Sequence, residues 1–252
     1  MILEEMCDIE KLIIIFLILA VFIADIGISE ANNSMLYPAN GEAGAGNIIT
    51  FDAYEQDNDA ANGKEPIEWI ILEKGSDGTL VLISKYALDC REYHSNCANV
   101  TWETCALRQW LNEDFYNTAF SAEERAKIQT VHLINEDNPF YGTKGSQDTF
   151  DRVWLLSINE VSDDFSTEAL YAFFADGAPG RCAPTKYAVA QGAYTSVSYT
   201  VDGIDACWWW LRSPGCNPAS AAGVSYDGDV CFDGYDVNFG SRGVRPAVRV
   251  LP

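Results

Sequence analysis

Two neighbouring segments near the C-terminal end of the sequence share one plan, a few strand-forming residues followed by Asp-Gly. They are Val224–Asp229 and Val230–Tyr235, with the Asp-Gly pairs at 227–228 and 233–234. Asp-Gly between strand-like runs is a strong hairpin signal, because glycine readily adopts the positive φ of tight hairpin turns. We therefore expect C-terminal β-hairpins, followed by a last strand over Gly243–Val250.

Upstream, the patterns predict one more hairpin and a helix. Pro66–Leu72 and Thr79–Ser84 are strand-like and are separated by the turn signal Ser76–Gly78. Apolar side chains then recur at spacings of three and four, which places them on one face of a helix. These residues are Leu107, Trp110, Leu111 and Phe115.

Two capping boxes predict further short helices. Ser121 with Glu124 and Ser157 with Glu160 each have the spacing that closes the first turn of a helix. The second box follows a short apolar strand over Val153–Leu156.

The remaining pattern completes an α+β plan. A further helix is expected over Glu168–Phe174, and strands and turns dominate after Ala188. Residues 32–47 are rich in Asn, Gly and Ala and are typical of a linker. We expect residues 48–252 to form one domain in which short helices pack against an antiparallel sheet with C-terminal β-hairpins.

The N-terminal segment points to export. Leu12–Ala24 carries no charge, and its length suits a signal-peptide core better than a membrane-spanning helix. Ser29–Ala31 supplies a cleavage site, so residues 1–31 are expected to be a signal peptide. Because four acids and one lysine precede the core, an uncleaved anchor that contacts the membrane through residues 12–28 stays open. A buried core helix is the third alternative.

Charge narrows the range of partners. The formal net charge is −21, from 37 acidic and 16 basic residues. Such a chain repels a phosphate backbone, so nucleic acid is not expected as a partner. The acids are spread along the chain, which favours solubility in an external medium over one specific cationic partner.

The cysteines do not predict a structural metal site. No C-x-x-C pair occurs, and the chain has two histidines. An odd number of cysteines after the apolar segment leaves a free thiol or an intermolecular bond, while Cys90 and Cys97 are close enough to close a small loop in an oxidising compartment. The cysteines after the segment are Cys90, Cys97, Cys105, Cys182, Cys207, Cys216 and Cys231.

No catalytic constellation or cofactor motif stands out. A G-x-S-x-G elbow is absent, and His94 and His132 fit a surface and a core role better than that of a catalytic base. Paired carboxylates could catalyse glycoside hydrolysis, but among 37 acidic residues some pair always lies at a suitable distance, so the sequence does not identify one. Four aspartates near the C-terminus have the ligand type that calcium prefers, but hairpin turns explain them without a metal. They are Asp227, Asp229, Asp233 and Asp236.

The most unusual stretch is a tryptophan run followed by an arginine. Alternation along a strand would place Trp209 on one side and Trp208 with Trp210 on the other. One side can then fill the core while the other forms a stacking platform. The alternative is that all three tryptophans pack in the core, which is expected for at least one of them. Arg212 and Arg245 are expected to brace loops by donating to backbone carbonyls or buried acids.

Five ordered motifs in this sequence resemble a large family of uncharacterised exported bacterial domains, common in gut Firmicutes. Members of that family in turn resemble the variable proteins of diversity-generating retroelements, which carry a C-type-lectin-like fold and a hypervariable binding surface. The resemblance covers roughly Ile48 to Pro252. They are Glu65–Leu72, Trp102 with Leu107–Asn112, Trp154–Ser157, Trp209–Gly215 and Gly243–Ala247.

The resemblance implies a C-type-lectin-like fold whose Gly215–Gly243 segment faces an unknown protein or glycan ligand at the cell surface. Calcium and sugar motifs of animal lectins are not visible, so neither a cofactor nor a sugar is implied. Aromatic, hydroxyl and carboxylate side chains in this segment have the chemistry of a binding surface. The expected contact residues are Ser225, Tyr226, Asp227, Asp229, Phe232, Asp233, Tyr235, Asp236, Asn238 and Phe239.

The composition gives separate evidence on whether such a retroelement diversifies the C-terminal segment. These systems randomise adenines. An Asn codon that ends in a pyrimidine then still ends in a pyrimidine, so it can never become a codon for Lys, Glu, Gln, Met or Trp. These five types make up 39 of the 252 residues, yet none occurs in Ser213–Pro252. About six would be expected from the chain average. Hairpins rich in Gly and Asp also disfavour Lys and Glu, so both explanations stay open.

The sequence therefore favours an extracytoplasmic binding or display module without catalysis. One alternative is an enzyme on the same fold, either a glycan-processing enzyme or one of the oxidative sulfatase-modifying type. Another is a structural component of a surface layer. A deep cleft with a perturbed acid would favour the enzyme, and a shallow exposed face would favour binding.

Overall fold

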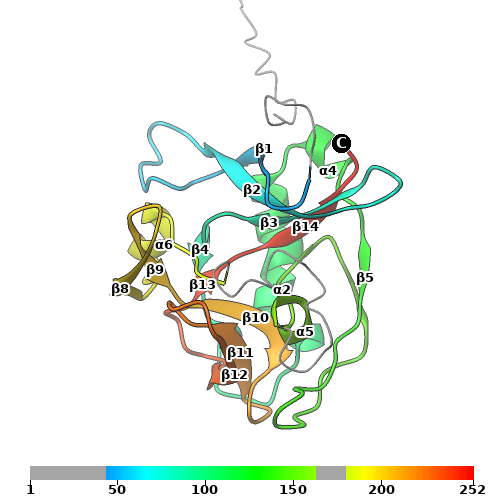
Figure 1. Ribbon diagram of the computed structural model, residues 1–252, viewed down its shortest axis with the longest axis vertical. Coiled ribbons are helices and arrows are strands. Elements are labelled where there is room, and N and C mark those ends of the chain that lie inside the picture. Colours follow the sequence, from blue (N-terminus) through cyan, green and yellow to red (C-terminus); the bar gives the residue numbers. More distant parts are fainter. Residues whose placement is uncertain (1–43, 163–179) are drawn as a thin grey trace, which may run out of the picture. The chain divides into compact units, whose positions relative to one another are not determined.

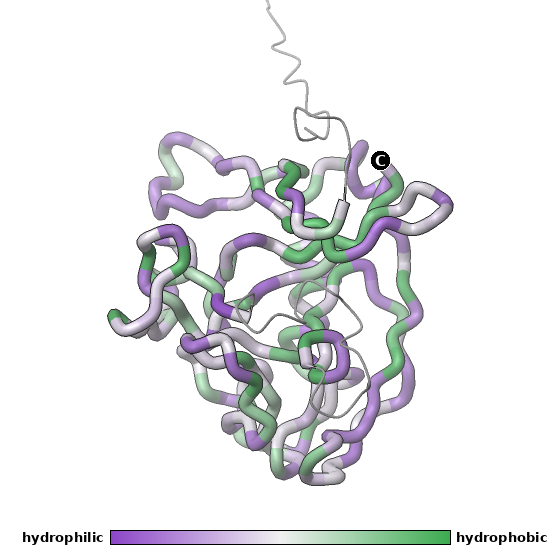
Figure 2. The backbone as a smooth tube through the Cα atoms, in the orientation of Figure 1, coloured by the Kyte–Doolittle hydropathy of each residue, from purple (hydrophilic) through white to green (hydrophobic). Residues whose placement is uncertain are grey.

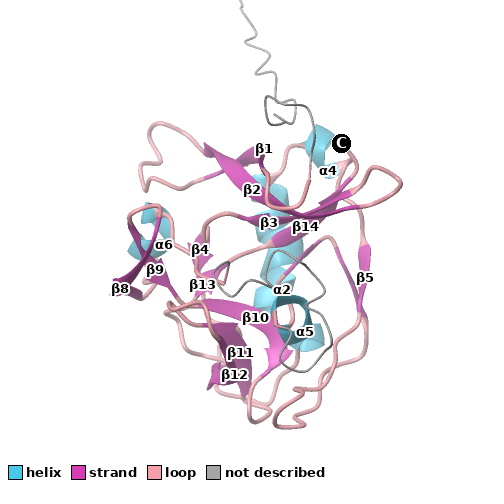
Figure 3. Ribbon diagram, in the orientation of Figure 1, coloured by secondary structure: helices cyan, strands magenta, loops and turns pink. Residues whose placement is uncertain are grey.

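The computed structural model describes residues 44–162 and 180–252. All of them belong to one unit, Met35–Pro252. Within the described residues, strands predominate and the helices are short (Figures 1 and 3), which confirms the α+β class. The predicted signal peptide, most of the linker and the predicted helix over Glu168–Phe174 lie outside the described residues.

The first five-stranded sheet is antiparallel throughout, with the order β1-β2-β3-β14-β7. Hydrophobic residues follow its strands, and hydrophilic stretches lie in the connecting loops (Figure 2). The hairpin predicted over Pro66–Ser84 is confirmed, because β2 and β3 pair antiparallel. Gly78 in the turn between them has φ +87°. The strands are β1 (Ile48–Tyr54), β2 (Glu65–Lys74), β3 (Leu80–Ser84), β14 (Ala247–Val250) and β7 (Val153–Trp154).

The second five-stranded sheet has the order β12-β11-β10-β13-β4. Its strands are antiparallel except for β10 and β13, which run parallel where Trp209 faces Gly243. The expectation of one antiparallel sheet was therefore wrong. Two sheets form, and the chain after β12 returns to insert between β10 and β4. The strands are β12 (Val230–Asp236), β11 (Ser220–Val224), β10 (Trp209–Pro214), β13 (Gly243–Val244) and β4 (Asp89–Cys90).

Two small strand pairs and several short helices complete the described fold. The pairs are β5 (Val131–Leu133) with β6 (Thr149–Asp151), and β8 (Thr195–Val201) with β9 (Ile204–Cys207). The helices are η1 (Trp102–Thr104), α2 (Ala106–Trp110), η2 (Leu111–Phe115), α3 (Tyr116–Ala119), α4 (Ala122–Arg125), α5 (Ile158–Val161) and α6 (Lys186–Ala190).

The predicted helical face is confirmed. The continuous segment formed by α2, η2 and α3 buries Leu107, Leu111 and Phe115. Trp110 is half-buried, and the Arg91 guanidinium lies 4.3 Å from its ring centre. The middle turn of this segment is π-helical, a local widening that spacing alone does not predict.

Both predicted capping positions start helices. At α5, the Ser157 amide donates to the Glu160 carboxylate at 2.7 Å, as in a capping box. At α4, the Ser121 hydroxyl accepts from the Glu124 amide at 3.2 Å. The Ser121 amide instead donates to the Asp52 carboxylate, so this second box is only half formed.

The two Asp-Gly pairs have different roles. The first lies in the β11–β12 turn, where the Gly228 amide donates to the Ser225 carbonyl at 3.0 Å. The second lies inside β12, at a bulge where Gly234 has φ +67°. A hairpin turn at Asp233-Gly234 was therefore a wrong prediction. The positive φ that the pair provides serves a bulge instead, and a Cβ on Gly234 would lie 2.1 Å from the Ala221 carbonyl oxygen.

Both predicted arginine braces are buried and donate to backbone carbonyls. Arg212 pairs with Glu160 through its two terminal guanidinium nitrogens, and one of them also donates to the Leu155 carbonyl at 3.0 Å. Arg245 donates to the Ser84 carbonyl at 2.9 Å. The Arg212 contacts tie β10 to the segment that leads into α5.

No helix among the described residues is long and apolar enough to span a membrane. The apolar segment Leu12–Ala24 lies outside those residues.

Candidate functional site

Five aromatic side chains form a continuous strip beside the C-terminal hairpin. Consecutive ring centres lie 5.5, 5.7, 4.9 and 6.1 Å apart. Four of the rings are half-buried and the last is exposed, so the series presents aromatic surface to solvent while its members pack on one another. In order, this aromatic strip consists of Tyr199, Tyr226, Trp208, Tyr235 and Phe239.

An arginine stacks at each end of the aromatic strip. The Arg181 guanidinium lies 4.9 Å from the Tyr199 ring centre. The Arg242 guanidinium lies 3.9 Å from Tyr235 and 4.9 Å from both Trp208 and Phe239. Within the described part of the chain, neither arginine has a carboxylate within 4.0 Å. Burial lowers the pKa of Arg242, and the faces of three rings surround this cation.

Trp208 reaches the strip because it lies just before β10. Trp209 and Trp210, within the strand, are both fully buried, and their indole nitrogens donate to the carbonyls of Gly180 and Arg91 at 2.9 Å. Trp210 is buried and Trp208 is half-buried, so the prediction that these two tryptophans form a platform together was wrong. Trp208 lies outside β10, and both sides of the strand are covered from Trp209 to Ser213.

A close backbone contact holds Arg181 against the hairpin turn. A Cβ on Gly180 would lie 2.1 Å from the Gly228 carbonyl oxygen, so only glycine fits there. The Arg181 Nε then donates to the Asp227 carbonyl at 2.9 Å. The segment before Cys182 therefore supports the turn that carries Tyr226.

A hollow of about 360 Å³ lies next to the strip and shares Trp208 with it. This volume is within the usual range for ligand sites, about 300–1,000 Å³. Its lining combines aromatic rings with three carboxylates. The lining residues are Phe140, Tyr141, Trp208, Ser225, Asp227, Asp229, Val230, Cys231, Phe232 and Asp233.

One buried asparagine fixes the two walls of the hollow. The Asn138 amide nitrogen donates to the carbonyls of Pro214 and Phe232 at 2.8 and 2.7 Å. Its carbonyl oxygen accepts from the amides of Phe140 and Tyr141 at 2.9 and 3.0 Å. The loop with the two rings is thereby joined to β10 and β12.

Nine of the ten predicted contact residues are at least partly exposed. Tyr226, Tyr235 and Phe239 belong to the strip. Asp227, Asp229, Phe232 and Asp233 line the hollow, as does Ser225, which is itself buried and closes the hairpin turn. Asp236 and Asn238 are exposed at and after the end of β12, outside both groups.

Sequence reasoning missed several residues that complete this surface. Tyr199 and Arg181 come from segments that precede the predicted site, and Arg242 follows its last strand. Phe140 and Tyr141 lie in a loop far from the hairpin in sequence. Trp208 had a signal in its place in the tryptophan run, and Arg242 lies within the segment Gly215–Gly243 that was expected to face the ligand.

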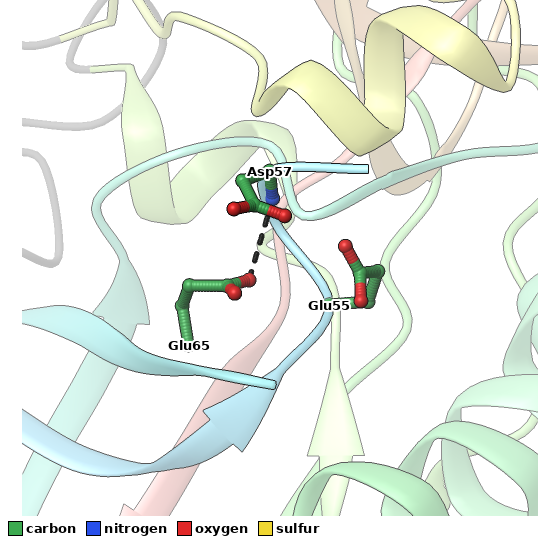
Figure 4. Close-up of side chains that lie close together, drawn as sticks. All are labelled: Glu55, Asp57 and Glu65. Atoms are coloured by element: carbon green, nitrogen blue, oxygen red, sulfur yellow. Dashed lines mark hydrogen bonds between the residues drawn. The ribbon is translucent and has the colours of Figure 1, made fainter. Parts of the chain in front are cut away.

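The described aspartates of the hairpin do not gather into a group of three that shares one metal-sized space. Within the described residues, such a group occurs at Glu55, Asp57 and Glu65 (Figure 4). There the Glu65 carboxylate already accepts from the backbone amides of Gln56 and Asp57 at 2.7 and 3.3 Å, which closes the loop between β1 and β2.

The predicted histidine and cysteine positions are also placed. His94 is half-buried and accepts from the Ala106 amide at 3.2 Å. His132 is exposed and lies 3.0 Å from Asp148, so the predicted core position of this histidine was wrong. Cys90 is buried and Cys97 is exposed, and both are free thiols.

The fold and the strip define a β-rich α+β domain with an exposed aromatic surface at its C-terminal hairpin. A model of a domain of unknown function, DUF6273, matches residues 77–252, which is more than half of the chain. The chain belongs to this family. No curated protein and no solved structure matches it.

Proposed function

We propose that the chain is an extracytoplasmic binding module of C-type-lectin-like fold that contacts its ligand through the aromatic strip and performs no catalysis. The observation that carries the proposal is the strip itself. Five packed rings flanked by Arg181 and Arg242 supply rigid contact area at low entropic cost. Tryptophan, tyrosine and arginine are also the residues that dominate binding energy at protein interfaces.

The adjacent hollow suggests the chemistry of the ligand. Aromatic faces attract cations, and Asp227, Asp229 and Asp233 add negative charge to the same wall. We infer that a basic side chain of a protein ligand enters the hollow while an apolar surface covers the strip. The net charge of −21 steers such a ligand toward the chain.

Diversification of Gly215–Gly243 fits this arrangement. Buried backbone-paired residues such as Ala221 and Val224 hold the sheet, while Asp229, Asp233 and Asn238 are exposed. Changes at the exposed positions alter contact chemistry at little cost to the fold. The resemblance to retroelement variable proteins supports the same assignment.

The alternative function, an enzyme on the same fold that uses a cysteine, needs an activated thiol as its nucleophile. Burial raises the pKa of the Cys90 and Cys105 thiols to about 12. At neutral pH both therefore remain protonated and poorly nucleophilic. This chemistry supports binding over a cysteine-dependent reaction at these residues.

The test is selection of a displayed random peptide library on the immobilised full chain. We expect enriched peptides that carry Lys or Arg next to aromatic residues. Trp208→Ser and Tyr226→Ser should abolish their binding, whereas Phe150→Ser, which removes an exposed ring elsewhere, should not. Circular dichroism checks that each variant is folded.

Peptides that bind all variants equally would place the site elsewhere, and no enrichment at all would contradict a peptide-like ligand. A glycan array run with the same variants covers the second ligand class. Trp208-dependent sugar binding there would reassign the ligand as a glycan.

Export is tested separately by fractionating the native host, where recovery of the full-length chain in the cytosol would contradict it.

A further inference from the structure

Two buried cysteines from separate segments lie directly opposite each other. Cys182 and Cys207 form an isolated antiparallel bridge, and the Cys207 amide donates to the Cys182 carbonyl at 2.8 Å. Opposed residues of an antiparallel pair have Cα atoms about 4.5–5.5 Å apart, which is within the disulfide range of about 4.4–6.8 Å. In the structure both are free thiols, and the Cys182 Sγ lies 3.7 Å from the Lys85 carbonyl oxygen and 3.4 Å from the Ala183 carbonyl oxygen.

The surroundings give the two sulfurs a dedicated space. Both cysteines are fully buried. A Cβ on Gly243 would lie 3.2 Å from the Cys207 sulfur and 2.7 Å from the Ala87 Cβ, so glycine at this position leaves room for the pair. Neither cysteine belongs to a described group of three metal-ligating side chains, which leaves thiol chemistry as the property to consider.

The two thiols differ in acidity. Burial would raise the pKa of Cys182, but the hydrogen bond with Cys207 and the nearby Arg245 guanidinium outweigh it and lower that pKa. The hydrogen bond with Cys182 and burial raise the pKa of Cys207 well above its ordinary value. Both shifts include an effect of the neighbouring thiol, in agreement with the opposed positions of the two cysteines in the bridge.

We propose that Cys182 and Cys207 form a disulfide bond during folding when a small-molecule disulfide such as oxidised glutathione is present. Before the two cysteines are buried, the thiolate of one of them attacks one glutathione sulfur, which breaks the glutathione S–S bond and releases one glutathione thiolate. The thiolate of the other cysteine then attacks the protein sulfur of the mixed disulfide and releases the second. Two protein thiols are oxidised, one disulfide is reduced to two thiols, and the cysteine protons go to the released thiolates.

The bond would fix the base of the aromatic strip. Arg181 precedes Cys182 and Trp208 follows Cys207, so each cysteine adjoins a residue of the proposed contact surface. The closed loop contains α6 and the β8–β9 hairpin, which carries Tyr199. A covalent link here reduces the ordering that ligand binding must supply.

The experiment is refolding of the full chain from denaturant in a glutathione redox buffer, followed by alkylation of free thiols and peptide mapping without reduction. We expect one linked peptide that joins Cys182 to Cys207, while Cys97 and Cys216 are alkylated. The melting temperature of the refolded chain should fall when dithiothreitol is added. Cys216→Ser, at an exposed cysteine, should retain both properties.

Cys207→Ser should lose the linked peptide and the response to dithiothreitol. Because that variant could fail to fold, the peptide map of the unaltered chain decides on its own. Alkylation of both Cys182 and Cys207 in every redox buffer, or a linked peptide that joins either to a different cysteine, would overturn the proposal. None of these readouts involves a ligand, so their failure is distinct from failure of the binding proposal.

Discussion

The Arg242 guanidinium carbon lies 3.9 Å from the centre of the Tyr235 ring, and the arginine side chain is buried. The same guanidinium also faces Trp208 and Phe239. One cation thus holds together a ring that lies just before β10, a ring of β12 and a ring of the loop after β12. The aromatic strip depends on this arrangement, because its rings come from segments that backbone hydrogen bonds alone would leave free to reorient.

Tyr235 should contribute measurably to stability although it is partly exposed. Tyr235→Ala removes the closest stacking contact of Arg242, and we expect a loss of about 1–3 kcal/mol in the free energy of unfolding. Asp229→Ala, on the same hairpin but exposed, should change it by less than about 0.5 kcal/mol. Urea denaturation measures both. Equal changes in the free energy of unfolding for the two variants would mean that the packing of Arg242 does not depend on the Tyr235 ring.

The buried pair of Arg212 and Glu160 should be costly to break from one side. Arg212→Met leaves the Glu160 carboxylate buried without its partner, and we expect a loss of about 3–5 kcal/mol. Replacing both residues by Leu should restore part of that loss. Lys144→Met removes an exposed ion pair with Asp137 and should cost less than about 1 kcal/mol. A similar, small loss for Arg212→Met would contradict the role of the pair.

Asn138 should control the hollow. Asn138→Ala leaves buried backbone groups without a partner, at about 1–3 kcal/mol for each. The amides of Phe140 and Tyr141 should therefore exchange with deuterium faster than in the unaltered chain. Asn117→Ala, at an exposed asparagine of α3, is the control. Unchanged exchange at both amides would show that the loop is held by other contacts.

Glu124 should make stability depend on pH. Burial and the neighbouring Asp52 raise the pKa of Glu124 to about 7. An unfolded chain ionises a glutamate near about 4.3, so between these values the unfolded state binds fewer protons. This contribution to stability is present below about pH 4.3 and is lost as the pH rises through about 7. Thermal unfolding of Glu124→Gln should lack this loss, and Glu123→Gln, at an exposed neighbour, should retain it.

The gene offers an independent test of diversification. If Gly215–Gly243 is diversified, the codons of Ser225 and of its Ala, Gly, Val, Pro and Arg residues should end in a pyrimidine. A near-copy with adenines at the differing positions should lie nearby, beside a reverse-transcriptase gene. Codons of Leu80–Ser84, in the first sheet, should show no such bias. Mixed third positions together with no template copy would exclude active diversification.

Local signals predicted local structure well. The apolar spacing that ends at Phe115, the serine caps, and Gly78 in its turn depend on neighbours within a few residues, and the structure has each of them. The signal at Asp233-Gly234 misled because a glycine with positive φ serves a bulge as well as a turn. A dipeptide cannot specify which of the two forms, since the choice depends on the register with β11.

The candidate site was predicted only in part, for a related reason. Tyr226 and Tyr235 share the hairpin and were found together. Tyr199, Arg181 and Phe140 reach the surface through pairings between distant segments, which residue spacing does not encode. Trp208 was identified as unusual, but the strand boundary that separates it from Trp210 is a tertiary property.

The strands β13 and β14 occupy interior positions in both large sheets, β13 between β10 and β4, and β14 between β3 and β7. During synthesis, residues 243–250 leave the ribosome after all of these partners. Until then each sheet lacks an inner strand, and four strand edges have unpaired backbone groups. A nascent chain without residues 243–250 therefore cannot complete either five-stranded sheet, and the last pairing in both sheets waits for one short segment.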